Sequence, residues 1–190
     1  MKGCDTELMI DTTAEGRCTA AELDAMLTEI AAGDLQALEQ LYRRTRASVY
    51  AFALSVLKNP QDAEDVLHDC YVAVWNGAAG YHSQGKPLAW LITVARNLCF
   101  QRIRQQKKTE DMRSEEWALC LPCERGLSPE DRSILSVCME QLSGQERQIV
   151  ALHAVSGFKH REIAELMDLP LPTVLSKYHR AVKRLKKIMQ

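Results

Sequence analysis

The chain has 190 residues, 46% of them hydrophobic, and a net charge of −1 at neutral pH. This length suits one large or two small domains, and no apolar run approaches the ~20 residues that span a bilayer. The acidic N-terminus lacks the apolar stretch of a signal peptide, and the seven scattered cysteines are an odd number, so the sequence predicts a cytoplasmic protein with reduced thiols.

Helix signals dominate the first half of the chain, and strand signals are almost absent. Thr19 and Glu22 have the spacing of a capping box in front of a helix. Asp34 can cap a second helix, and an Asn-Pro pair at Asn59 marks the start of a third. Residues 76–87 are rich in glycine and end in proline, which predicts a loop. This half is therefore expected to be helical, with one long loop before its last helix.

The helix of residues 86–108 has two unlike faces when its residues are placed 100° apart. One face is apolar and consists of Leu91, Val94, Ala95 and Leu98. The other is polar and cationic, with one aromatic ring, and consists of Thr93, Arg96, Asn97, Phe100, Arg104 and Lys107. Trp90 lies on the border. Cations contact phosphates and an exposed ring can stack on an unpaired base, so this face is predicted to bind nucleic acid. The alternative is that Trp90 and Phe100 are core residues and the arginines are solvated.

Helical periodicity fades between residues 109 and 129, where acids and prolines predict a linker between two domains. Cys120 and Cys123 in this segment form a single CxxC pair. Such a pair can supply two zinc ligands or a redox couple. No second pair accompanies it, so the sequence favours neither a metal site nor a cofactor.

The C-terminal part resumes the helical pattern. We expect a helix at 134–142, one opened by a capping box at Ser143, a short helix at 160–167 and a long basic helix at 172–188. The last two have helix-turn-helix spacing. The outer face of the second combines short polar groups with cations, as in a recognition helix: Thr173, Ser176, Lys177, Arg180, Arg184 and Lys187. A coiled coil or a simple bundle is the alternative.

Charge follows the same division of the chain. Residues 1–40 carry a net charge of −7, residues 41–108 of +6, residues 109–146 of −6 and residues 147–190 of +6. Two basic blocks separated by an acidic one suggest two polyanion-binding modules. Chance clustering of solvated charge is the alternative.

Three motifs together resemble a known family. They are AEDVLHDCYVAVW (63–75), AWLITVARN (89–97) and a helix-turn-helix reading EIAELM…TVLSKYHRA. In this order and spacing they resemble the extracytoplasmic-function class of sigma-70-type RNA polymerase sigma factors. The resemblance implies an all-α fold with two small helical domains joined by a flexible linker. Its domains would be a sigma-two domain at 20–108 and a sigma-four domain at 130–190, with the linker at 109–129 between them. The acidic extension at 1–19 has no assigned counterpart in the family.

The resemblance also implies partners and binding residues. Core RNA polymerase would contact the helix of the first motif through Glu64, Asp65, His68, Asp69 and Trp75. The melted −10 element would contact the loop and the following helix through Tyr81, His82, Ser83, Gln84, Lys86, Trp90, Thr93, Arg96, Asn97, Phe100 and Arg104. The C-terminal helix-turn-helix would read the −35 element as duplex. An anti-sigma factor is a further expected partner.

Two other functions remain open at this point. A stand-alone helix-turn-helix regulator would bind duplex DNA but would not need residues 63–108, which contain the first two motifs. A thiol-based redox enzyme or sensor would use the CxxC. The sequence contains no P-loop, nucleophile elbow or paired-histidine metal motif, so no enzymatic activity is expected.

Overall fold

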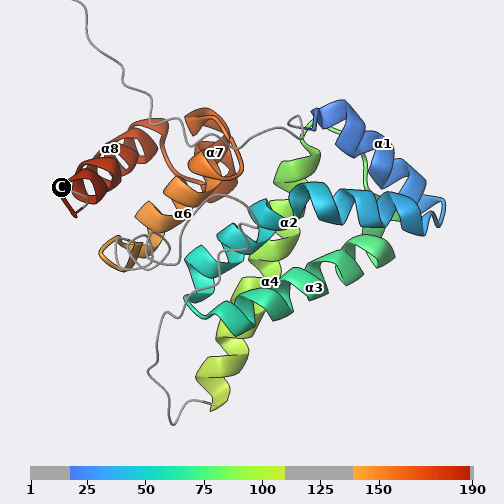
Figure 1. Ribbon diagram of the computed structural model, residues 1–190, viewed down its shortest axis with the longest axis horizontal. Helices are drawn as coiled ribbons and strands as arrows, with labels where there is room; N and C mark the ends of the chain where they lie inside the picture. The colour runs from blue at the N-terminus through green and yellow to red at the C-terminus, as the bar shows by residue number, and fades with distance from the viewer. Residues whose placement is uncertain (1–17, 110–138, 189–190) are drawn as a thin grey trace, which may run out of the picture.

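The structure, a computed structural model, describes residues 18–109 and 139–188, and every regular element in these ranges is helical (Figure 1). This confirms the predicted all-α fold. The acidic extension, almost all of the predicted linker, and Cys120 and Cys123 lie outside the described residues.

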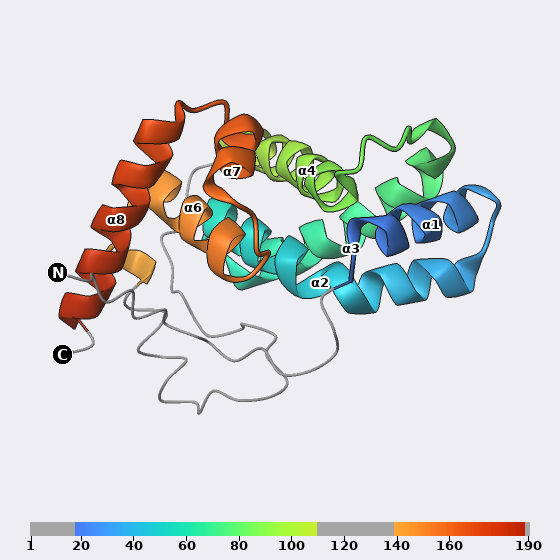
Figure 2. The ribbon, with the colours of Figure 1, turned by 90° about the horizontal axis from the view of Figure 1, so that it is seen from above.

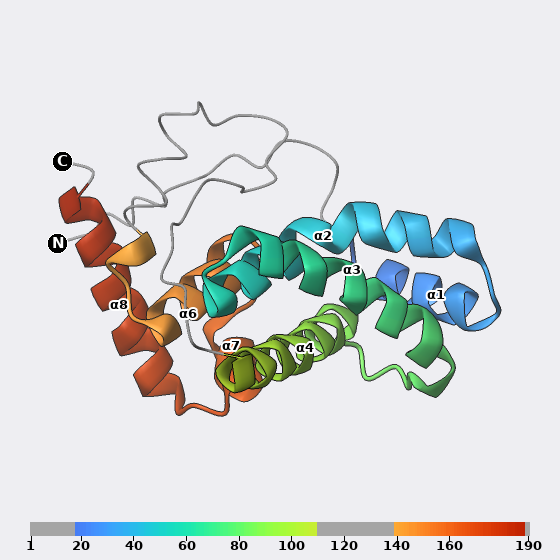
Figure 3. The ribbon, with the colours of Figure 1, turned by 90° about the horizontal axis from the view of Figure 1, so that it is seen from below.

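The N-terminal bundle contains four α-helices and one short turn of 3-10 helix. The helices are α1 (Ala20–Ala31), α2 (Leu35–Leu57), α3 (Pro60–Gly77) and α4 (Pro87–Thr109), and the 3-10 turn is Ala78–Gly80. Helix α2 packs against α1, α3 and α4, and Figure 3 shows it alongside α1 and α3.

The starts of these helices follow from local capping groups. Thr19 and Glu22 form the predicted capping box, in which the Glu22 carboxylate accepts from the Thr19 backbone N–H at 2.7 Å. The Asp34 carboxylate accepts from the first-turn N–H groups of α2, and Asn59 caps α3. Each cap pairs N–H groups that have no partner within the helix, which is why the sequence predicts these boundaries well.

The buried face of α4 is broader than its apolar stripe. Leu91 and Ala95 are buried as predicted, but Val94 is only half-buried. Ile92 and Cys99, outside the predicted stripe, are fully buried. Helix α4 packs against both α2 and α3, so two neighbours bury a wider arc than one would.

The C-terminal bundle contains α6 (Gly144–Ala154), α7 (His160–Met167) and α8 (Leu171–Ile188). Ser143 forms the predicted capping box at the start of α6. Asp168 ends α7 in the left-handed region, with φ of 53°, and α8 begins three residues later. The predicted helix 134–142 falls mostly outside the described residues. Helices α7 and α8 therefore have the expected helix-turn-helix arrangement.

Three elements of this bundle meet at a cluster of aromatic and imidazole rings. The rings of His153 and His160 stack with centroids 4.4 Å apart, and Tyr178 of α8 lies edge-on to both, at 4.8 and 4.7 Å. Among the described residues, the buried Nε2 of His160 meets no hydrogen-bond partner. Burial lowers the pKa of His160, and the neighbouring His153 and His179 lower it further.

Stability should consequently decrease in mild acid. Because the pKa of His160 is lower in the folded chain than its unfolded value of about 6.5, the unfolded chain takes up this proton first as pH falls. The neutral, buried His160 therefore contributes its full share of the unfolding free energy above pH ~6.5, and this contribution is lost as the pH falls below that value. Urea unfolding followed by helicity at about pH 7.5 and pH 5.5 should show a smaller decrease in unfolding free energy for His160→Gln than for the parent. An equal decrease in both proteins would contradict this role.

Candidate nucleic-acid interface

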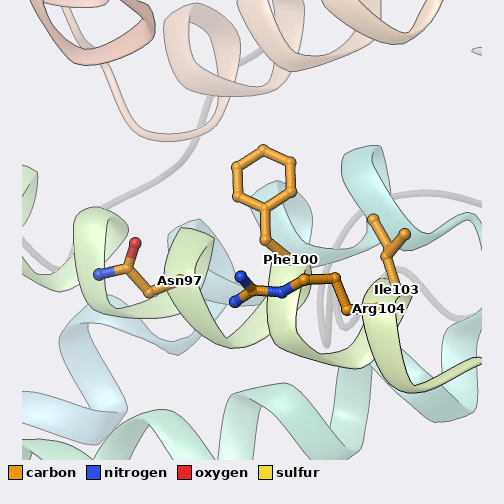
Figure 4. Close-up of a pocket in the computed structure, with 4 residues that line it drawn as sticks. All are labelled: Asn97, Phe100, Ile103 and Arg104. Atoms are coloured by element: carbon orange, nitrogen blue, oxygen red, sulfur yellow. The ribbon is translucent and has the colours of Figure 1, made fainter.

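The predicted nucleic-acid face of α4 carries polar and aromatic side chains that the bundle leaves uncovered. Thr93, Asn97 and Arg104 are exposed, and Phe100 is 43% exposed although it is a large apolar residue. The Phe100 ring stands out from the helix between Asn97 and Arg104, beside an open hollow that also includes Ile103 (Figure 4). The protein core therefore does not account for this ring.

Arg96 lies beside this ring and also reaches the other bundle. Its guanidinium carbon is 5.5 Å from the centroid of the Phe100 ring, within the range of a cation–π contact. Its NH1 donates a hydrogen bond to the carbonyl oxygen of Leu166 in α7, with a distance of 2.9 Å. Arg96 therefore joins the exposed ring to the end of the first helix of the helix-turn-helix.

The loop before α4 is held by its first aromatic residue. The Tyr81 hydroxyl donates to the Asp24 carboxylate of α1 at 2.5 Å, and the Tyr81 ring packs on Trp90 with centroids 4.8 Å apart. Burial, followed by the Asp24 carboxylate, raises the pKa of Tyr81 to about 12. His82, Ser83, Gln84 and Lys86 follow and are all exposed.

Asp24 was not among the residues predicted from the sequence. It anchors the loop from a different helix, 57 positions earlier in the chain. No local pattern relates positions so far apart. The only sequence signal is an acid next to the apolar stripe of α1.

The predicted polymerase-binding residues of α3 fall into two groups. Glu64, His68 and Asp69 are exposed. Asp65 instead pairs with Arg102 of α4 at 2.5 Å, and Trp75 is half-buried against the core. The first three therefore form a free surface, whereas Asp65 also ties α3 to α4.

Arg102 of α4 pairs with two acids of α3 and so connects the two helices. It also bonds Asp62 at 2.8 Å, and Gln106 of the next turn donates to the same Asp62 carboxylate at 2.7 Å. Hydrogen bonds to Asp62 raise the pKa of Arg102, and the contact with Asp65 adds to this effect. One arginine of the basic block thus serves the packing of the bundle.

Helix α8 separates its apolar and cationic faces. Val174 and Ala181 are fully buried, and Tyr178 is half-buried against them. Ser176, Arg180 and Lys187 are exposed on the other side, and Thr173 and Lys177 are half-buried. The Arg180 Nε donates to the Ser176 carbonyl at 3.2 Å.

Arg184 has partners within the bundle. Its NH1 donates to the Gln141 carbonyl at 2.8 Å and lies 3.4 Å from the buried Glu146 carboxylate. Glu146 is also the third residue of the α6 capping box. Arg184 therefore links α8 to the start of α6.

The thiols that the structure describes do not have the environment of reactive cysteines. Burial raises the pKa of Cys70 and of Cys99 to about 12 each, which disfavours the nucleophilic thiolate. Within residues 18–109 and 139–188, no three histidine, cysteine or acidic side chains converge as a metal site. Nor does any helix in those ranges have the length and apolar character needed to cross a membrane.

Two parts of the chain match sigma-factor families. Residues 41–109 match the family Sigma-70 region 2, and residues 127–185 match Sigma-70, region 4. Together the two matches cover most of the chain, and they include α3, α4 and the helix-turn-helix.

Curated relatives extend the match to nearly the whole length. The ECF RNA polymerase sigma factor SigK of Mycolicibacterium vanbaalenii is 28% identical over 189 residues, covering 96% of each chain. SigK of Mycobacterium ulcerans is 26% identical over 172 residues, which cover 87% of this chain and 92% of that relative.

Solved structures share the fold. The sigma factor RpoE of Bartonella quintana, solved with the anti-sigma factor NepR, has a TM-score of 0.67 at 23% identity and covers 80% of this chain and 95% of its own. CnrH, solved with the cytosolic domain of CnrY, has a TM-score of 0.63 at 19% identity, with coverage of 88% and 97%. The two family matches, the relatives and the helical fold show that the chain belongs to the extracytoplasmic-function class of sigma-70-type sigma factors, which bind core RNA polymerase and direct transcription initiation at promoters.

Proposed function

We propose that three surfaces of this sigma factor divide the work of initiation. The exposed face of α3 binds core polymerase. The loop 81–86 and the outer face of α4 bind the melted −10 strand. The outer face of α8 reads the −35 element as duplex.

The exposure of Phe100 is the observation that carries this proposal. A single exposed apolar residue is common on a protein surface, as Leu35 shows, and what distinguishes Phe100 is its position on the polar and cationic face of α4. Here the ring lies among exposed polar groups and beside Arg96, 5.5 Å away. A ring with cations beside it suits a base with its phosphates.

The proposed division into two domains is supported by the two separate family matches, at residues 41–109 and 127–185. The sigma-two domain extends over residues 20–108 and the sigma-four domain over 130–190, with the linker 109–129 between them and the acidic extension 1–19 before them. Helices α1–α4 fall in the first domain and α6–α8 in the second.

The remaining assignments concern the cellular setting. Two structural neighbours were solved with NepR, an anti-sigma factor, and with the cytosolic domain of CnrY. By analogy we propose that an anti-sigma factor also controls this chain. We further propose that the chain acts in the cytoplasm, where it regulates transcription without catalytic activity of its own.

A run-off transcription assay with core polymerase tests the proposed function.

A charge reversal at Asp69 tests whether the exposed face of α3 binds core polymerase. Asp69→Lys should weaken binding to core about tenfold or more, because reversal replaces an attraction by a repulsion at an interface. Its helicity should be unchanged, since Asp69 is exposed. Asp65→Lys is a poorer probe because it would also break the Arg102 pair.

Glu29→Lys on α1 is the matched control, because it reverses one exposed acid outside the proposed surface. Titration of each variant with core polymerase, followed by gel filtration, gives the affinities. Equal binding by Asp69→Lys and Glu29→Lys would mean that the polymerase interface lies elsewhere.

A further inference from the structure

A side chain of α1 holds the loop that precedes α4. The Asp24 carboxylate accepts a hydrogen bond from the Tyr81 hydroxyl at 2.5 Å, and the Tyr81 ring packs on Trp90 with centroids 4.8 Å apart. Figure 2 shows the segment between α3 and α4 beside α1, and the 3-10 turn of this segment packs against α1. Asp24 is therefore connected through Tyr81 to the first turn of α4, which belongs to the proposed −10 surface.

The backbone of this loop is fixed at both ends. At its start, the Tyr81 N–H donates to the Ala78 carbonyl at 3.0 Å, and at its end the Lys86 carbonyl accepts from the Trp90 N–H at 3.1 Å. Residues 82–85 between these ends are all exposed. Because these residues have no core to pack against, the two ends determine the path of the stretch between them. The Tyr81 side chain is the part of the first end that reaches α1.

Tyr81 differs from the exposed loop residues that follow it. Its side chain is half-buried, its hydroxyl is bonded to Asp24, and part of its ring is covered by Trp90. A base that bonded this hydroxyl would have to replace a carboxylate, which is a stronger acceptor than a neutral base atom. These contacts suit a support inside the loop better than a contact with a DNA strand.

We propose that Asp24 is a positioning residue for promoter recognition: through Tyr81 it holds the loop in the shape in which residues 82–84 meet the unpaired −10 base, and Tyr81 supports the loop without contacting the strand. The proposal rests on the −10 surface assigned above and adds α1 to the elements that determine base preference. A site rejects a wrong base through clashes and unpaired polar groups. A loop that can move relieves both, so loss of the support should reduce discrimination between bases.

Base preference of the holoenzyme tests this role. The holoenzyme is titrated with promoter fragments that are already melted at the −10 region and that carry each base in turn at one position. Asp24→Ala and Tyr81→Phe should each lower the affinity ratio between the best and the worst base about three- to tenfold, the scale of one hydrogen bond. Asp24→Asn should keep most of the preference, because its amide oxygen can still accept from the hydroxyl. Binding to core polymerase should be equal in all three variants.

The double variant Asp24→Ala with Tyr81→Phe shows whether the two residues act through each other. If they form one support, the double variant should discriminate no worse than either single variant, whereas independent contributions would multiply. Glu29→Ala removes an exposed acid from the same helix and should leave the preference unchanged. Multiplied losses, an equal loss in Glu29→Ala, or full preference in Tyr81→Phe would overturn the proposal. Tyr81→Phe lacks one oxygen and keeps its ring, so it is informative even if Asp24→Ala does not fold.

The combined replacement His82→Ala with Gln84→Ala separates this proposal from the −10 assignment on which it rests. It removes two exposed side chains of the loop and leaves the Asp24–Tyr81 hydrogen bond in place. If this variant changes the base preference and the Asp24 and Tyr81 variants do not, only the positioning role fails. If none of these variants changes the base preference, the loop does not read the −10 element, and both the assignment and the positioning role fail.

Discussion

Replacing Phe100 with alanine should impair transcription from a duplex promoter by about 5- to 150-fold, since stacking is worth roughly 1–3 kcal/mol per base. The ring is 43% exposed, so its removal should leave the bundle intact. On duplex DNA the stacking energy offsets part of the cost of unpairing the base. On a template that is already melted, this cost is absent, and the defect should be smaller.

Leu35→Ala is the control for Phe100→Ala, because it removes another exposed apolar side chain, 66% exposed at the start of α2. Open-complex formation should be compared on duplex and pre-melted versions of one promoter. An equal loss on both templates would indicate a folding defect and would return Phe100 to the core. Trp90→Ala is less informative, because the Trp90 ring packs on Tyr81 and its removal should loosen the loop on either template.

The helix boundaries could be predicted because capping is local. A side-chain oxygen and the N–H groups it accepts from are two or three residues apart, as at Thr19 and Ser143. Sequence alone contains that information. The separation of apolar and cationic faces on α8 could be predicted for the same reason, since both follow from a period of 3.6 residues.

The rotation of α4 in the bundle could not be predicted in the same way. Its apolar stripe included Val94 and Leu98, which are only half-buried, whereas Ile92 and Cys99 outside the stripe are fully buried. A helix packed against two neighbours is oriented by the shape of the groove between them. That shape depends on the side chains of α2 and α3, which the pattern of α4 does not contain.

Charge patterning identified the basic blocks but not the use of each cation. Arg102 and Arg184 were part of these blocks, and both pair with acids inside their own bundles. The contact between Lys86 and Glu165 joins positions 79 residues apart. A single sequence contains no signal for such pairs, because any exposed acid could equally well be the partner of Lys86.

The largest effect on specificity is expected at Arg180. Arg180→Ala should relax the preference at one position of the −35 element, because a good bidentate contact with guanine discriminates by roughly 1–3 kcal/mol. Its exposed side chain lies at the middle of α8, next to the N-terminal turns that reach base edges in a recognition helix. Lys187 lies two turns farther along and should meet phosphate. Lys187→Ala should therefore weaken binding to all promoter sequences alike. It should also reduce the slope of log K against log salt concentration by about 0.9.

Holoenzyme binding to a panel of −35 variants over a range of salt concentrations separates these two roles. Arg43→Ala removes an exposed cation of α2 together with a surface ion pair to Glu39 that contributes little to stability, so it is the control for loss of charge. Arg184→Ala would not serve, since it also breaks the bond to Gln141. If Arg180→Ala and Lys187→Ala change every promoter by the same factor, the cationic face only anchors phosphate. Base reading would then belong to the short side chains Thr173 and Ser176, whose hydroxyls can donate to or accept from a base edge.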